Sequence, residues 1–311
     1  MAGILVYSDK NSFAYELLTA AKDIAKELGL DVSALGINDE ELVRDLSKRC
    51  KEVYAINNEV LQLADTAAMA SALAQVVGTF DISVILTSSN RRGKELAGRL
   101  AAVLDCGCLT DVNGVDVRDE KIYCRRNAFG GATVATQVIE TEKKVIAIAP
   151  KTFDLEKETE SGVIREVEVD VAPSGITVIE VRPKATDAVD IEAAEVLVAM
   201  GQGLDSQEYM PMIEVLAKAL GGEVACTKPI ATDNRWLSEE RIIGLSGKKC
   251  KPDLAILLGI SGQVQFTVGI RDAKTIIAVN TDENANIMHM ADYKMVADMK
   301  EVVSALVNKV G

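Results

Sequence analysis

Hydrophobic and polar positions alternate with two periods along the first 150 residues. Short apolar runs predict strands, and longer stretches with apolar residues at helical spacing predict the helices between them. The expected strands are 3–7, 31–35, 53–56 and 82–87, and the expected helices are 11–28, 61–77 and 94–104, with a short helix opening at Asp39. Gly29 is placed to end the first helix. Strands and helices that alternate in this way predict an α/β domain with a parallel sheet.

The period shortens between residues 109 and 181. Apolar runs there predict further strands at 132–139, 145–149, 163–171 and 176–181, the later ones mainly antiparallel. The acidic stretch 154–160 is expected to be a solvated turn.

A second series of strands and helices follows a polar, proline-containing segment at 182–190, which we interpret as a linker. Its expected strands are 195–200, 223–226, 254–258, 275–279 and 295–297, with a helix over 207–220. The sequence therefore predicts two domains, residues 1–190 and 191–311.

Composition excludes several classes of function. The chain has 34 basic and 47 acidic residues, a net charge of −13, which does not suit a nucleic-acid binder. The longest uncharged run, 254–270, is too short and too polar to be inserted in a membrane, and no secretory signal is visible, so we expect a cytoplasmic protein. With one histidine and no paired cysteine motif, we expect no metal site, no catalytic residue and six ordinary thiols.

Polar residues follow the expected strands of the second domain. They are Gln202, Thr227 with Lys228, Ser261, Asn280 and Asp298. Carboxyl ends of parallel strands share one edge of a sheet, where ligands bind, so these residues predict a ligand site. The loop 201–206 is either part of that site or a plain turn in which Asp205 caps a helix and Glu208 completes a capping box. In the loop 259–265, two glycines, Ser261 and two glutamines suit a phosphate or a flavin edge better.

Longer segments of the second half match one family in order and spacing. The most specific are GISGQVQ, IIAVNTDENANI and ADYKMVAD, and residues 92–111 and 127–154 match more loosely. Over essentially its whole length the chain resembles the α subunit of electron transfer flavoproteins. The resemblance implies an N-terminal α/β domain like that of adenine-nucleotide hydrolases, packed on a β subunit, and a C-terminal doubly wound parallel-sheet domain that binds FAD.

The same resemblance implies an electron carrier and not an enzyme. Such a heterodimer moves electrons from a dehydrogenase, for example an acyl-CoA dehydrogenase, to another redox protein. Carried over by position, the FAD contacts would be Gln202, Thr227, Lys228, Ile243, Gly244, Leu245, Ser246, Ser261, Gly262, Gln263, Val264, Gln265, Phe266, Asn280, Asp298 and Met299. Ser246 would lie near flavin N5, and Lys228 would place a positive charge over the ring.

Four positions depart from the family pattern. Gln202 stands where the family has Arg, and Phe266 stands where it has His. Thr227 with Lys228 replaces Ser-Arg, and Leu245 with Ser246 replaces Gln-Thr. Because all four fall in the expected site, an alternative is a subunit that keeps the fold, binds an adenine nucleotide or no cofactor, and has a structural or regulatory role.

Overall fold

The structure, a computed structural model, describes residues 3–131, 133–172, 174–180 and 189–310. Its contacts divide the chain into two compact units, residues 1–181 and 182–311. Most of the predicted linker, 182–190, lies outside the described residues. Val189 packs against the core of the second unit. The boundary between residues 190 and 191 stays a prediction.

The first unit is built on a nine-stranded sheet with the order β7-β6-β5-β8-β4-β1-β2-β3-β9. Neighbouring strands are parallel except in the arm β5-β6-β7, which is antiparallel. The strands are β1 (Gly3–Tyr7), β2 (Asp31–Ile37), β3 (Glu52–Ile56), β4 (Ile82–Ser88), β5 (Gly107–Arg118), β6 (Lys121–Ala128), β7 (Thr133–Val138), β8 (Lys144–Ile148) and β9 (Val163–Glu166).

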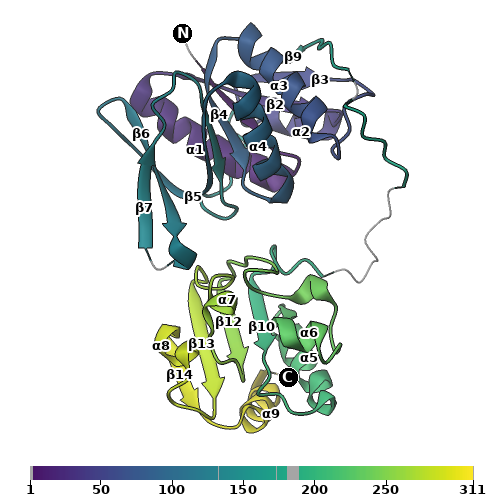
Figure 1. The fold of residues 1–311 in the computed structure, drawn as a ribbon, viewed down its shortest axis with the longest axis vertical. Helices are drawn as coiled ribbons and strands as arrows, with labels where there is room; N and C mark the ends of the chain where they lie inside the picture. Colours follow the sequence, from purple (N-terminus) through teal and green to yellow (C-terminus); the bar gives the residue numbers. More distant parts are fainter. Residues whose placement is uncertain (1–2, 132, 173, 181–188, 311) are drawn as a thin grey trace. The chain divides into compact units, whose positions relative to one another are not determined.

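Helices cover both faces of this sheet (Figure 1). Successive side chains of a strand point to opposite faces. Ile4 and Val6 of β1 pack with α1 (Asn11–Leu28) and α2 (Glu40–Ser47). Leu5 and Tyr7 pack with the helices on the other face, α3 (Thr66–Thr79) and α4 (Arg91–Leu104). A 3₁₀ turn, η1 (Phe129–Gly131), follows β6.

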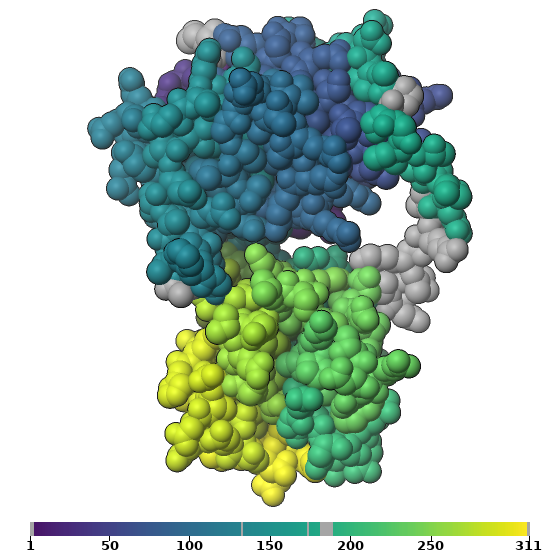
Figure 2. All heavy atoms as spheres, viewed as in Figure 1, coloured from purple at the N-terminus to yellow at the C-terminus, as the bar shows by residue number. Residues whose placement is uncertain are grey.

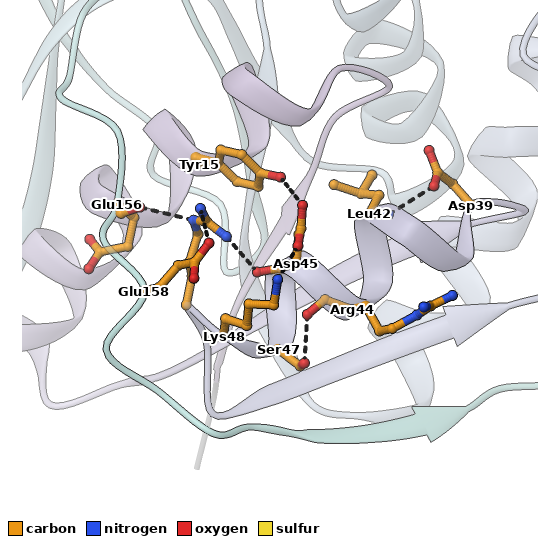
Figure 3. Close-up of polar contacts among 10 residues, drawn as sticks. Tyr15, Asp39, Leu42, Arg44, Asp45, Ser47, Lys48, Glu156 and Glu158 are labelled. Atoms are coloured by element: carbon orange, nitrogen blue, oxygen red, sulfur yellow. Dashed lines mark hydrogen bonds and ion pairs between the residues drawn. The ribbon is translucent and has the colours of Figure 1, made fainter.

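Local capping explains where these helices begin and end. Gly29 adopts a left-handed conformation after α1, as predicted, and the Asp39 carboxylate accepts a hydrogen bond from the Leu42 amide (Figure 3). The predicted helix over 61–77 begins later, because Asp65 caps it by accepting from the Ala68 amide at 3.0 Å. The predicted helix over 94–104 begins earlier, because Asn90 accepts from the Gly93 amide at 2.7 Å.

The expectation that the later strands are mainly antiparallel is wrong for β8 and β9. Strand β8 inserts between β4 and β5 and is parallel to both, and β9 lies parallel to β3 at the sheet edge. The long strands β5 and β6 were not predicted. The chain leaves the ladder after Glu166, and residues 176–180 form no strand. Figure 2 shows the chain that follows Glu166, in teal-green, on the outside of the first unit.

The acidic stretch 154–160 is mostly exposed, as expected, but it forms no turn and is held by ion pairs. The Lys22 ammonium lies 3.1 Å from the Glu156 carboxylate, which is 16% exposed. Arg49 donates from Nε to the Glu156 carbonyl at 3.0 Å and pairs with Glu158 at 2.9 Å (Figure 3). Two cations of the first unit therefore hold this stretch along its surface.

The second unit is a five-stranded parallel sheet with the order β11-β10-β12-β13-β14. Its strands are β10 (Val196–Met200), β11 (Glu223–Cys226), β12 (Leu254–Leu258), β13 (Thr275–Asn280) and β14 (Tyr293–Val296). One face carries α5 (Met210–Ala219) and α9 (Met299–Val310), and the other carries α7 (Val264–Thr267) and α8 (Asn286–Met290). The remaining helices are η2 (Gln207–Tyr209), α6 (Lys228–Thr232) and η3 (Glu239–Arg241).

The predicted fold class is confirmed: both units are α/β, and the second is a doubly wound parallel sheet. Among the residues that the structure describes, no helix has the length and apolar character needed to cross a bilayer. In the same described ranges, no group of three or more His, Cys, Asp or Glu side chains is arranged to hold a metal ion. The cytoplasmic location stays a prediction.

Candidate functional site

The sheet of the second unit changes winding direction between β10 and β12. The chain leaves β10 toward α5 on one face and leaves β12 toward α7 on the other. Neighbouring strands whose connections diverge in this way leave a crevice at their carboxyl ends, where ligands bind. A cleft of about 910 Å³ lies there. Its volume is at the upper end of the range of roughly 300–1,000 Å³ for ligand pockets.

Two glycines let the loops after β10 and β12 approach closely. The Gly203 amide donates to the Gly259 carbonyl at 2.9 Å. A Cβ atom on Gly203 would lie 2.7 Å from the Gly259 Cα, and Gly259 itself has a φ of +59°. Side chains at either position would force the loops apart, so the glycines shape the floor of the cleft.

A third loop, residues 243–248, is held against the start of α7. The Leu245 amide donates to the Gln265 carbonyl at 2.7 Å, and the Gly244 amide donates to the Lys248 carbonyl at 3.1 Å. Gly244 has a φ of +134°, and a Cβ there would lie 2.3 Å from the Gln265 carbonyl oxygen. These contacts bring Ile243, Ser246 and Phe266 to one wall of the cleft.

The cleft presents polar groups that the protein itself does not use. The Thr227 hydroxyl is buried and has no hydrogen-bond partner in the described part of the chain. Within the same residues, the Lys228 side chain forms no ion pair and is the cation of the lining. A buried hydroxyl without a hydrogen-bond partner lowers the stability of the protein. A ligand that completes its hydrogen bonding is therefore favoured. Burial raises the pKa of the neighbouring Cys226 thiol to about 12, so this thiol stays protonated and does not act as a nucleophile.

Most of the predicted site residues line this cleft. They are Gln202, Thr227, Lys228, Ile243, Ser246, Ser261, Gln263, Gln265, Phe266 and Asn280. Gly244, Leu245, Gly262 and Val264 belong to the same loops without lining it, and Leu245 and Val264 are exposed. The prediction missed polar residues that also line it, Thr232 and Asp233 after β11 and Asp282, Asn284 and Asn286 after β13. The polar run after β13 was a visible signal for the last three.

Asp298 and Met299 are not brought into the cleft lining. Strand β14, which precedes them, is separated from the β10–β12 switch by β13. The Asp298 carboxylate instead accepts from the Lys300 amide at 2.8 Å at the start of α9. Met299 is 5% exposed and packs in the core beneath α5 and α9.

The turn after β10 is capped differently from the expected capping box. Ser206, and not Asp205, is the N-cap of η2, and its hydroxyl accepts from the Glu208 amide at 3.3 Å. Asp205 pairs with Lys300 at 3.0 Å, and this hydrogen bond lowers the pKa of the Asp205 carboxyl. The predicted helix 207–220 is divided into η2 and α5 at Met210.

The first unit has its own switch point, between β1 and β4. The cavity there is about 20 Å³ and is lined by Tyr7, Ser8, Thr87 and Arg92, among others. Arg92 pairs across it with Asp9 at 3.1 Å. This space holds about one water molecule, so the switch point of the first unit has no room for a dinucleotide.

Comparison with known proteins also assigns different family models to the two units. Residues 7–173 match the electron transfer flavoprotein domain, and residues 190–271 match the electron transfer flavoprotein FAD-binding domain. Protein FixB of Escherichia coli O9:H4 (strain HS) is 31% identical over 307 residues, 97% of this chain and 96% of that protein. The chain belongs to the electron transfer flavoprotein α-subunit family. FAD is the cofactor of this family's C-terminal domain, as predicted.

A second relative is equally similar to this chain. Protein FixB of Escherichia coli O127:H6 (strain E2348/69 / EPEC) is 31% identical over 310 residues, with 97% of this chain and 96% of that protein covered. A solved structure of a putative thiamin diphosphate-dependent enzyme from Mycobacterium smegmatis covers 98% of this chain and 59% of its own, at 10% identity and a TM-score of 0.24. That likeness is too low to bear on fold or function. Members of the electron transfer flavoprotein family are electron carriers and not catalysts.

Proposed function

We propose that this chain is the α subunit of a heterodimeric electron transfer flavoprotein. It binds FAD in the cleft of the second unit and moves electrons from a dehydrogenase, such as an acyl-CoA dehydrogenase, to another redox protein. The observation that carries this proposal is that the open cleft at the β10–β12 switch point lies mainly within the segment that matches the FAD-binding domain. The β subunit docks on the first unit, as the resemblance to the family implies.

The residues of the cleft fit FAD. The ligand's many acceptor atoms suit the Thr227 hydroxyl, which has no partner among the described residues. The Lys228 ammonium, which forms no ion pair among them, attracts the anionic cofactor and would lie over its ring, as the family resemblance implies. The Gly203–Gly259 contact leaves backbone without side chains at the switch point, where a bulky ligand must approach. FAD supplies the one- and two-electron chemistry, while the chain binds it, orients it and limits its contact with water.

A second candidate function rests on the replaced residues. Gln202 and Phe266 both line the cleft and carry no charge, in positions where the family has Arg and His. A subunit that has lost flavin could retain the fold and take an adenine nucleotide, or no cofactor, in a structural or regulatory role.

One experiment separates the two candidates. The chain is co-expressed with its β subunit, the complex is purified, and its visible absorption spectrum and released nucleotides are measured. The proposal expects the two absorption bands of oxidised flavin and one FAD bound in the α subunit of each heterodimer. A folded, colourless complex would contradict it, and release of an adenine nucleotide without flavin would establish the alternative.

A further inference from the structure

Asn280 lies at the carboxyl end of β13 and lines the cleft. Its side-chain Nδ2 donates to the Ile260 carbonyl at 2.8 Å. Its Oδ1 accepts from the Asp282 amide at 2.9 Å. Both ends of this amide are therefore engaged by the backbone of the chain itself. Ile260 is 1% exposed, so in the natural chain its carbonyl receives this hydrogen bond from Asn280 and little contact from water.

The first bond joins the end of β13 to the loop that follows the neighbouring strand β12, and the second ties the Asn280 side chain to the start of its own loop. Ile260 belongs to the loop after β12, which brings Gly259 and Ser261 to the cleft. Asp282 begins the loop after β13, which brings Asn284 and Asn286 to it. The Ile287 amide of α8, the helix that follows the loop after β13, donates to the Ser261 carbonyl at 3.2 Å, so a second bond ties the loop after β12 to this region.

We propose that Asn280 is a positioning residue, which sets the spacing of the loops after β12 and β13 so that FAD can seat between them and the loop after β10. This inference rests on the proposed function. It assigns the Asn280 side chain to the shape of the cleft, in addition to any contact with the ligand. A residue that acts through loop spacing differs in one testable respect from a residue that only contacts FAD. Any side chain that again donates a hydrogen bond to the Ile260 carbonyl should restore FAD binding.

The Asn280→Asp variant tests this point through pH. Its carboxylate can still accept from the Asp282 amide, but it cannot donate to the Ile260 carbonyl. The negative carboxylate oxygen instead repels the partly negative carbonyl oxygen. Protonation creates an O–H donor in the same place. We therefore expect FAD affinity about tenfold weaker than that of the natural chain at pH 8, with recovery as the pH falls toward the pKa of the new carboxyl. The affinity of the natural chain should change little over that range.

Asn38 offers a matched control in the first unit. Its Nδ2 donates to the Asn58 and Leu61 carbonyls at 2.9 and 2.8 Å, and its Oδ1 accepts from the Asn58 amide at 2.8 Å. Asn38→Asp makes the same chemical change to a loop-joining amide far along the chain from the cleft. It should leave FAD affinity unchanged at every pH.

The measurement is a titration of the flavin-free heterodimer with FAD, followed by quenching of flavin fluorescence. The inference would be overturned if Asn280→Asp bound FAD at pH 8 as tightly as the natural chain does. It would also be overturned if the weakened binding did not recover on acidification. If Asn280→Asp does not fold, Asn280→Ala removes both bonds without adding a charge. It should weaken FAD binding about tenfold at all pH values, and unchanged binding would overturn the inference equally.

Hydrogen exchange distinguishes failure of this inference from failure of the proposed function. If the natural chain binds no FAD, the proposed function is wrong. The amide of Asp282 should still exchange at least tenfold faster in Asn280→Ala than in the natural chain without any ligand. Equal exchange would show that Asn280 does not hold the loops.

Discussion

The Thr227 hydroxyl is a single buried atom whose hydrogen bonding the described residues leave incomplete. Thr227→Val removes it at nearly constant volume. The flavin-free protein should become more stable by about 1 kcal/mol, because an unsatisfied buried group is lost, while FAD binding should weaken about tenfold. Thermal unfolding and FAD titration measure the two effects.

Thr87→Val is the control, since the Thr87 hydroxyl is also buried without a partner in the described residues but lies in the first unit. It should stabilise the protein and leave FAD affinity unchanged. Equal FAD affinity in Thr227→Val and the natural chain would remove Thr227 from the binding site.

Phe266 lines the cleft, is 6% exposed and offers no hydrogen-bond donor. In Phe266→His, a donor would lie in the flavin site and stabilise the negative charge that reduction adds to the ring. A hydrogen bond to a charged group contributes about 2 kcal/mol. That energy corresponds to a rise of roughly 85 mV in the first reduction potential of bound FAD.

A reductive titration with a reference dye measures this potential. Phe266→Leu, which removes the aromatic ring without adding a donor, is the control and should not raise the potential. If Phe266→His keeps FAD bound and leaves the potential where it was, Phe266 does not face the part of the ring that becomes charged.

At the scale of elements, the close approach of the loops after β10 and β12 shapes the cleft. Gly203→Ala places a methyl group 2.7 Å from the Gly259 Cα, and backbone on both sides must move to accommodate it. We expect a loss of roughly 1–3 kcal/mol in the free energy of unfolding of the second unit, together with weaker FAD binding.

Gly98→Ala is the matched control. Gly98 lies within α4, and a Cβ there meets nothing within 4 Å. This substitution should stabilise the first unit by roughly 0.5–1 kcal/mol, because alanine favours the helix, and should not affect FAD. Denaturant unfolding checks both variants. A Gly203→Ala protein as stable as the natural chain would show that the loops have more room than the structure gives them.

At the scale of the whole molecule, each unit has its own hydrophobic cores on both faces of its own sheet. The fragment 182–311 should therefore fold by itself and bind FAD, since every described residue that lines the cleft belongs to that unit. Circular dichroism with a cooperative thermal transition checks folding, and flavin absorbance after gel filtration checks binding. A folded fragment that binds no FAD would mean that the first unit or the β subunit supplies part of the site.

Local patterns in the sequence were enough for most helices and parallel strands and for most of the candidate site, but not for β5 and β6. Apolar periodicity identified β1, α1 and four of the parallel strands of the second unit, because each depends on residues adjacent in the chain. The exposed strand β14 begins two residues before the predicted 295–297. The residues at strand ends could be grouped from the sequence alone, because parallel strands necessarily end at one edge. Gly29 and Asp39 marked helix ends for the same local reason.

Only the tertiary structure decided which segments pair. No local feature tells that β8 enters between β4 and β5, or that Lys22 and Arg49 hold the acidic stretch 154–160. The order of strands also separates Asp298 from the cleft, although it follows a strand as Asn280 does. Strand partners and ion pairs are set by side chains far apart in the sequence, whose meeting depends on how the whole sheet packs.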